Sequence, residues 1–163
     1  MFIDETWAKT DMTRPRERAP QGRASVGQRA AWSFLAALHA TGLTAPLVVD
    51  GAINGEIFLE WVRHHLVPTL QPGDVVVMDS LGVHKVASVR EAIVAAGLRV
   101  IYLPACSPDL NPSDLVFSKF KWLLKSAYAG NVEALWSVCG DVLDRFTEVE
   151  CRNCFQHCGY RDT

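Results

Sequence analysis

Three aspartates lie in contexts that suit chemistry: Asp4 in FIDET, Asp79 at the end of DVVVMD, and Asp114 in SPDLNPSD. The run from Val75 to Asp79 is too short for a helix and rich in β-branched residues, which predicts a buried strand. A charge that closes such a strand is costly to bury and usually has a partner. Ligands of open α/β sheets collect at the carboxyl ends of strands, so we expect Asp4 and Asp79 to meet there. Hard oxygen ligands of this kind suit Mg²⁺ or Mn²⁺, and the sequence therefore predicts a metal site.

The third acid is expected on a helix. Between Asp79 and Asp114 lie residues 80–113, enough for one helix, one strand and a turn that returns to the same sheet edge. Pro112 suits the first turn of a helix running to about Ala127, which places Asp114 in that turn. Two strand-borne aspartates and one helix-borne acid can hold two divalent ions, which activate a nucleophile and stabilise the leaving oxygen in phosphodiester chemistry. A structural role stays open for each acid, and for Asp114 the favourable helix dipole would be reason enough.

The predicted helix from Pro112 has an apolar stripe at three- and four-residue spacing. The stripe consists of Leu115, Val116, Phe120, Leu123 and Leu124. Lys119 falls inside the stripe and is expected to extend its amine toward solvent. Lys121 and Lys125, four residues apart, share the opposite face with Asp114.

The remaining elements are predicted with unequal strength. A helix over 86–96 and a strand over 99–103 follow strand 75–79, which makes a right-handed βαβ unit with parallel strands. Residues 57–66 have the spacing of an amphipathic helix that ends at Pro68, and a last helix covers about 132–146. Other segments are predicted as follows: Met1–Glu5, the end of a strand whose beginning is missing; 9–29, a loop with at most one weak edge strand; 30–40, a strand or a short helix; 47–50, a short strand. Trp7 and Trp122 are expected in the core.

Composition predicts one soluble globular domain over residues 1–163, with 49% hydrophobic and 21% charged residues. The net charge of -2 gives no global attraction to nucleic acid, although six basic residues crowd one stretch and could meet phosphates. They are Lys9, Arg14, Arg16, Arg18, Arg23 and Arg29. A solvated basic loop is an equally good interpretation of this stretch. No apolar run suits a membrane span and no signal peptide is evident, so we expect a cytoplasmic location.

The five cysteines do not suggest a disulfide framework, because their number is odd and four of them come late in the chain. In CRNCFQHC, the residues Cys151, Cys154, His157 and Cys158 could be imagined as zinc ligands. Ligands so crowded in sequence would struggle to reach tetrahedral geometry. At helical spacing, the three cysteines are better explained as small apolar residues that face the core.

At this point the motifs resemble a known family. FIDET, VVMDSLGVHK and YLPACSPDLNPSDLVFSKFKWLL are similar to the catalytic domain of DDE/D transposases, in the bacterial insertion-sequence branch of the mariner superfamily. The resemblance implies a ribonuclease H-like fold, a mixed sheet flanked by helices. It also implies that Asp4, Asp79 and Asp114 are the catalytic, metal-binding triad. The reaction would be DNA cleavage by water, followed by attack of the freed 3′-hydroxyl on target DNA.

Several positions depart from the family pattern. The third acid, commonly glutamate in the bacterial branch, is Asp114; Ser80 replaces an asparagine, and Ala105-Cys106 replaces Pro-Tyr. Residues 23–33 read as less strand-like than the family's second strand, so we expect truncated N-terminal strands. No helix-turn-helix precedes Met1, which suggests a separate upstream DNA-binding part from a split or frameshifted reading frame.

Partners follow from the resemblance: transposon ends and target DNA, and a homo-oligomer that holds them. Candidate DNA-contacting residues are His84, Lys85, Lys121, Lys125, Arg14, Arg16 and Arg18, and simple solvent exposure is the alternative for each. Two other functions stay open. The chain could be an inactive truncated transposase remnant, or a free-standing metal-dependent ribonuclease H-like nuclease.

Overall fold

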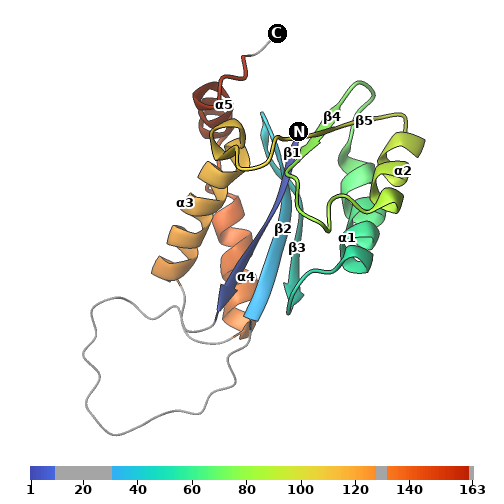
Figure 1. Ribbon diagram of the computed structural model, residues 1–163. Helices are drawn as coiled ribbons and strands as arrows, with labels where there is room; N and C mark the ends of the chain where they lie inside the picture. Colours follow the sequence, from blue (N-terminus) through green and yellow to red (C-terminus); the bar gives the residue numbers. More distant parts are fainter. Residues whose placement is uncertain (10–30, 128–131, 162–163) are drawn as a thin grey trace, which may run out of the picture.

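The computed structural model describes residues 1–9, 31–127 and 132–161, which build a mixed sheet with the strand order β3-β2-β1-β4-β5 (Figure 1). The strands are β1 (Phe2–Lys9), β2 (Ala31–His39), β3 (Gly42–Asp50), β4 (Val75–Met78) and β5 (Arg99–Tyr102). The first three form an antiparallel meander, and β4 and β5 run parallel to β1. The predicted mixed sheet is confirmed, and so is the parallel βαβ unit from β4 to β5.

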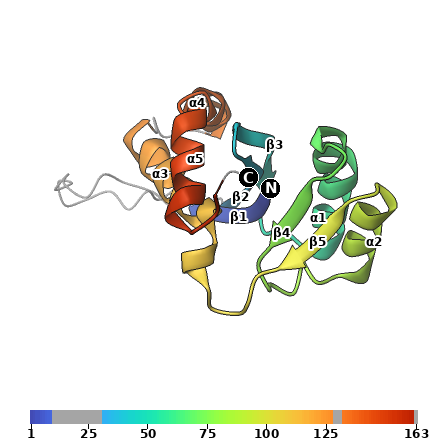
Figure 2. The same ribbon diagram turned by 90° about the horizontal axis from the view of Figure 1, so that it is seen from above.

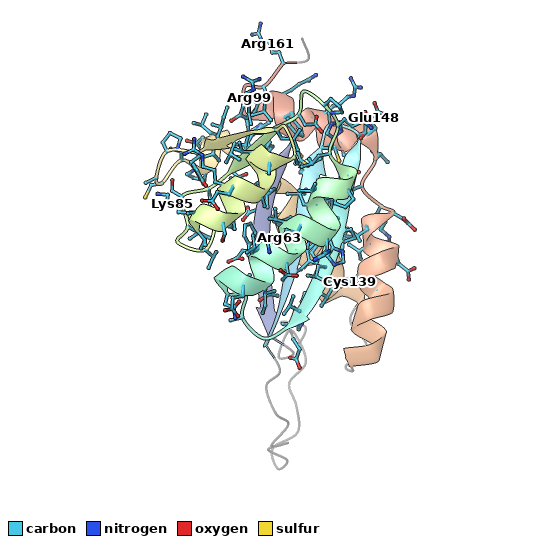
Figure 3. The ribbon with its side chains drawn as sticks, turned by 90° about the vertical axis from the view of Figure 1, so that its right-hand side faces the viewer. Arg63, Lys85, Arg99, Cys139, Glu148 and Arg161 are labelled. Atoms are coloured by element: carbon cyan, nitrogen blue, oxygen red, sulfur yellow. The ribbon has the colours of Figure 1, made fainter. Side chains whose placement is uncertain are left out.

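Helices cover both faces of this sheet (Figure 2). On one face lie α1 (Gly55–Trp61), which continues as a π-helical and a 3-10 turn to Thr69, and α2 (Ala87–Ala95). Figure 3 views this face, with Arg63 on the continuation of α1 and Lys85 just before α2. On the other face lie α3 (Pro112–Ala127), α4 (Val132–Leu143) and α5 (Glu148–His157). The sheet therefore separates two apolar cores.

The alternation of side chains along β1 divides its residues between the two cores. Phe2 packs in the core beneath α3 and α5, and Ile3 packs in the core beneath α1 and α2. Asp4 therefore points to the α3 side and Glu5 to the opposite side. This alternation decides which helix can supply partners to each acid.

The N-terminal strands are longer than the sequence predicted. β1 spans eight residues and β2 spans nine, so the expectation of truncated strands is wrong. Residues 31–39, undecided between strand and helix, form β2, because both of their faces are buried between the two cores. β3 begins at Gly42 rather than at 47.

Two expectations about α3 need correction. Trp122 is 65% exposed and Leu115 is 40% exposed, so neither belongs to the core. The other four residues of the predicted stripe are buried. Lys119 extends out of the stripe as expected: its amine contacts the Glu150 carboxylate and lies 5.0 Å from the centroid of the Phe146 ring. The side chains of Trp7 and Lys125, and the loop residues Arg14, Arg16 and Arg18, lie outside the described part.

The cysteine-bearing tail is a helix of its own, α5, which starts at a capping box between Thr147 and Glu150. Cys151 and Cys158 are buried and Cys154 is half-buried, as the helical spacing predicted. Burial raises the pKa of the Cys151 thiol to about 11, so this thiol stays neutral at physiological pH. Within residues 1–9, 31–127 and 132–161, no helix combines the length and apolarity that crossing a membrane requires.

Candidate active site

Asp4 and Asp79 lie on neighbouring parallel strands. The register between β1 and β4 pairs Phe2 with Val77 and Ile3 with Met78, so the next residues along the two strands are Asp4 and Asp79. Adjacent strands run about 4.8 Å apart, which brings the two backbones side by side. This register brings the two acids together at the carboxyl end of β4, as the sequence suggested. Asp4 is nevertheless the third residue of β1, so the expectation that Met1–Glu5 is the end of a strand is wrong.

Asp4 is almost wholly buried, with 6% of its surface exposed. Its Oδ1 accepts from the backbone N–H of Glu5 at 2.8 Å, and its Oδ2 accepts from Asn111 Nδ2 at 3.0 Å and from Ser113 Oγ at 3.2 Å. Burial raises the pKa of Asp4 to about 6, and the charges of Asp114 and Asp79 add to this rise against the opposing hydrogen bonds from Glu5 and Asn111. Asp114 and Asp79 therefore lie close enough for their charges to act on the Asp4 carboxyl.

Asp79 is held in a different way, at the start of the loop after β4. Its Oδ1 accepts from the backbone N–H of Leu81 at 3.0 Å and lies 2.5 Å from His84 Nδ1. Burial alone would raise the pKa of this carboxyl, but these two hydrogen bonds, with the charges of His84 and Lys85, hold it below its ordinary value. Among the described residues, nothing forms a hydrogen bond with Asp79 Oδ2, so this oxygen is free for a ligand.

Asp114 completes the group from the first turn of α3, as predicted. A 3-10 turn over Pro108–Leu110 precedes the helix, and Pro112 begins it. The side chain is exposed and lines a cleft of about 310 Å³ together with Asp79 and Asn111. The cleft thus has two acids on its wall, with Asp4 behind Asn111.

The three acids form an open group rather than a finished cage. Within the described residues, no three histidine, cysteine or acidic side chains are placed to hold a metal ion between them. The donor chemistry nevertheless fits a divalent cation, because Asp4 is a carboxyl whose pKa is raised first by burial and then by the charges of Asp114 and Asp79, and a bound cation would stabilise its ionised form. Mg²⁺ commonly takes one or two carboxylates and completes its shell with water and phosphate oxygens.

Sequence reasoning missed Asn111 and Ser113, which are buried and donate hydrogen bonds to Asp4. The available signal was their position, because both lie inside SPDLNPSD beside the acid Asp114. His84 is the opposite case. It was expected to contact DNA, but its side chain is completely buried, so from this position it cannot reach a phosphate. Lys85 is exposed and Lys121 is half-buried.

The C-terminal segment supports the turn that carries the third acid. Tyr160 Oη donates to the carbonyl of Leu110 at 2.9 Å, and its ring lies 4.9 Å from the ring of Phe2 in an edge-to-face contact. Leu110 is the last residue of the 3-10 turn before Asn111. The tail therefore links the 3-10 turn to the start of β1.

Tyr160→Phe is expected to lower the free energy of unfolding by about 0.5–1 kcal/mol, because one hydrogen bond is lost at a solvent-exposed site. Tyr160→Leu should cost more, since it also removes the ring contacts with Phe2 and Phe155. Guanidinium unfolding of the two variants measures this order. Wild-type stability in Tyr160→Phe would show that the hydroxyl contributes nothing to the turn, and equal losses in the two variants would show that the ring contacts contribute nothing.

Comparison with known proteins places this arrangement in a family. The sequence model of the DDE superfamily endonucleases matches residues 1–136. The chain belongs to the DDE superfamily endonucleases. The family that the motifs predicted is thereby confirmed, and none of the curated proteins matches the sequence.

Solved structures show that this DDE superfamily endonuclease shares its fold with mariner transposases. It matches the Mos1 strand transfer complex with a TM-score of 0.73 and 16% identity, over 96% of this chain and 51% of that one. It matches the catalytic domain of Mos1 mariner transposase with a TM-score of 0.66 and 13% identity, over 99% of this chain and 83% of that one. The predicted ribonuclease H-like architecture is confirmed. The chain spans about half the length of the Mos1 chain in the strand transfer complex.

Proposed function

We propose that this chain is the catalytic domain of a transposase that cleaves DNA strands and joins them to target DNA with divalent metal ions. The observation that carries the proposal is the convergence of Asp79 and Asp114 on Asp4, whose carboxyl both charges act on. The family match supports phosphodiester chemistry. Structural neighbours include a Mos1 paired end complex with Mn and a Mos1 strand transfer complex.

In this proposal Asp4, Asp79 and Asp114 hold two Mg²⁺ or Mn²⁺ ions, which would supply an activated attacking hydroxyl and charge stabilisation at the leaving oxygen. The protein contributes the placement of the ligands. Asp79 is anchored through Oδ1, which leaves Oδ2 open to an ion. Asp4 is oriented by hydrogen bonds from Asn111 and Ser113. The exposed position of Asp114 leaves this side chain able to adjust to the bound strand.

DNA is the proposed partner, as transposon end and as target, on a homo-oligomer that holds two ends together. Lys85 is exposed close to Asp79, whose pKa its charge lowers, and can meet a phosphate beside the cleft. Lys121, Lys125, Arg14, Arg16 and Arg18 stay proposed backbone contacts, as the sequence suggested. In this proposal an upstream helix-turn-helix part recognises the specific transposon ends. The protein acts on DNA in the cytoplasm.

Nicking of supercoiled plasmid tests the proposed chemistry without knowledge of the natural ends. With Mn²⁺ the chain is expected to convert supercoiled to open-circular plasmid, and excess EDTA should stop the conversion. A labelled duplex with a recessed 3′-hydroxyl should become joined to the plasmid in the same reaction. A folded chain that neither nicks nor joins DNA would support the remnant alternative.

The same preparation separates the proposal from the nuclease alternative. An RNA–DNA hybrid should be cut no faster than DNA duplex, whereas a ribonuclease H-like nuclease would degrade the RNA strand preferentially. The lengths of β1 and β2 weigh against the remnant alternative, because every residue of β1 pairs with one of β2.

A further inference from the structure

We propose that His84 is a positioning residue that fixes the carboxylate of Asp79 for metal binding, an inference that rests on the proposed function of the same site. His84 follows Asp79 by five residues in the loop between β4 and α2. Its Nδ1 lies 2.5 Å from Asp79 Oδ1. An ionised carboxylate can only accept, so Nδ1 carries the proton and donates it to this bond.

The imidazole is held on several sides. Its ring centroid lies 4.6 Å from that of Phe58 on α1, with the planes inclined at 38°. The backbone carbonyl of His84 accepts from Tyr102 Oη at 3.1 Å, and its backbone N–H donates to the carbonyl of Leu81 at 3.2 Å. The side chain is completely buried. The ring is therefore a fixed donor, and the Asp79 carboxylate takes its orientation from it.

Packing alone does not account for a histidine here. Among the described residues, His84 Nε2 is buried without a hydrogen-bond partner, which costs free energy that a phenyl ring at the same place would not cost. Glu5, on the adjacent β1, has a buried and unpartnered Oε2, and the charge of His84 acts on its carboxyl. The charges of both His84 and Asp79 act on the Glu5 carboxyl, so the three polar groups are neighbours.

The consequence for the site is geometric. Oδ1 of Asp79 is engaged by both His84 and Leu81, and this leaves Oδ2 as the oxygen that can coordinate an ion. Hydrogen-bond partners that orient metal ligands typically change metal affinity or activity by 10–100-fold when they are removed. His84 is expected to fall in this range.

Two substitutions separate positioning from packing. His84→Asn keeps an amide N–H at the place of Nδ1, whereas His84→Phe keeps the ring against Phe58 and removes the donor. The primary readout is Mn²⁺ affinity by calorimetry, with the chain alone and with a duplex that carries a recessed 3′-hydroxyl. We expect His84→Phe to weaken Mn²⁺ binding about 10-fold or more and His84→Asn to stay within about threefold of the wild type. In plasmid nicking, the same shift should appear in the Mn²⁺ concentration at half-maximal rate.

The outcomes are distinguishable from those of the proposed function. Wild-type affinity in a folded His84→Phe chain would overturn the positioning role even if DNA is cleaved normally. An equal loss in both variants would also overturn it, because the donor would then not matter. A third outcome is possible. If the wild type and His84→Asn bind Mn²⁺, His84→Phe does not, and the wild type fails to cleave DNA, the positioning role stands and the transposase function is rejected. Absence of Mn²⁺ binding by the wild type in both formats would overturn both.

Discussion

Asp79→Asn is expected to lower the rate of Mn²⁺-dependent plasmid nicking by roughly a thousandfold while the chain stays folded. Metal-assisted stabilisation of the transition state is worth several kcal/mol, and about 4 kcal/mol corresponds to this factor. Asparagine can still accept the Leu81 N–H bond and the His84 bond through its amide oxygen, so the loop keeps its anchor. What is lost is the charge that attracts a cation. The rate of supercoiled-plasmid nicking under saturating Mn²⁺ measures the effect.

Asp109→Asn is the matched control for this substitution. Asp109 lies in the 3-10 turn before α3 and is exposed, but it does not line the cleft. Its loss should leave the nicking rate within about twofold, since a surface acid outside the site contributes only a screened charge. Circular dichroism establishes that both variants are folded. Nicking by Asp79→Asn at a rate near that of the wild type would remove Asp79 from the catalytic assignment.

Asp4→Asn is expected to make the protein more stable at pH 7.5 and to abolish cleavage. In the folded chain the pKa of Asp4 is about 6, against an ordinary value of 3.8. An acid whose pKa is raised by folding binds protons more tightly in the folded state, so ionising it destabilises the fold. The rise from 3.8 to about 6 corresponds to roughly 3 kcal/mol at neutral pH, and Asp4→Asn should recover a large part of it.

The sign of the pH dependence follows from the same comparison. The free energy of unfolding that Asp4 contributes is highest below about pH 4, where the carboxyl is protonated in both states. It falls as pH rises from about 4 to 6 and is constant above that window. The stability gain of Asp4→Asn should therefore be largest at pH 7.5 and small at pH 4.5. Guanidinium unfolding of both proteins at these two pH values measures it. Mn²⁺ should stabilise the wild type and not the variant, because only an intact site binds the ion in the folded state.

Asp114→Asn provides the control for burial. This acid is exposed, so its substitution should change stability by about 0.5 kcal/mol or less, although it should also impair cleavage. If Asp4→Asn instead destabilises the chain at pH 7.5, the hydrogen bonds from Asn111 and Ser113 outweigh the burial of the charge. The inference that ionised Asp4 destabilises the fold would then be wrong.

Local patterns were enough to predict much of the fold. The β-branched run located β4, and three- and four-residue spacing located the helical segment of α1 and the stripe of α3 within a few residues. The N-terminal strands were less predictable, because β2 is buried on both faces and lacks the alternation that marks a half-buried strand. Trp122 was placed wrongly because large aromatic residues are usually buried, and only the packing of α3 shows which side of the helix is covered.

The candidate site divides in the same way between local sequence and folded structure. The three aspartates and their likeness to a DDE family follow from short motifs. Asp79 was predicted correctly because a charge that closes a buried strand is informative, whereas Asp4 lies near the start of β1 and not at a strand end. Only the tertiary structure shows that Asn111 and Ser113 donate hydrogen bonds to Asp4 and that the pKa of Asp4 is raised. It also shows that His84 is buried against Asp79 rather than exposed on the surface. These properties depend on burial and on distances between segments far apart in the chain. Neither quantity is present in a linear pattern of residues.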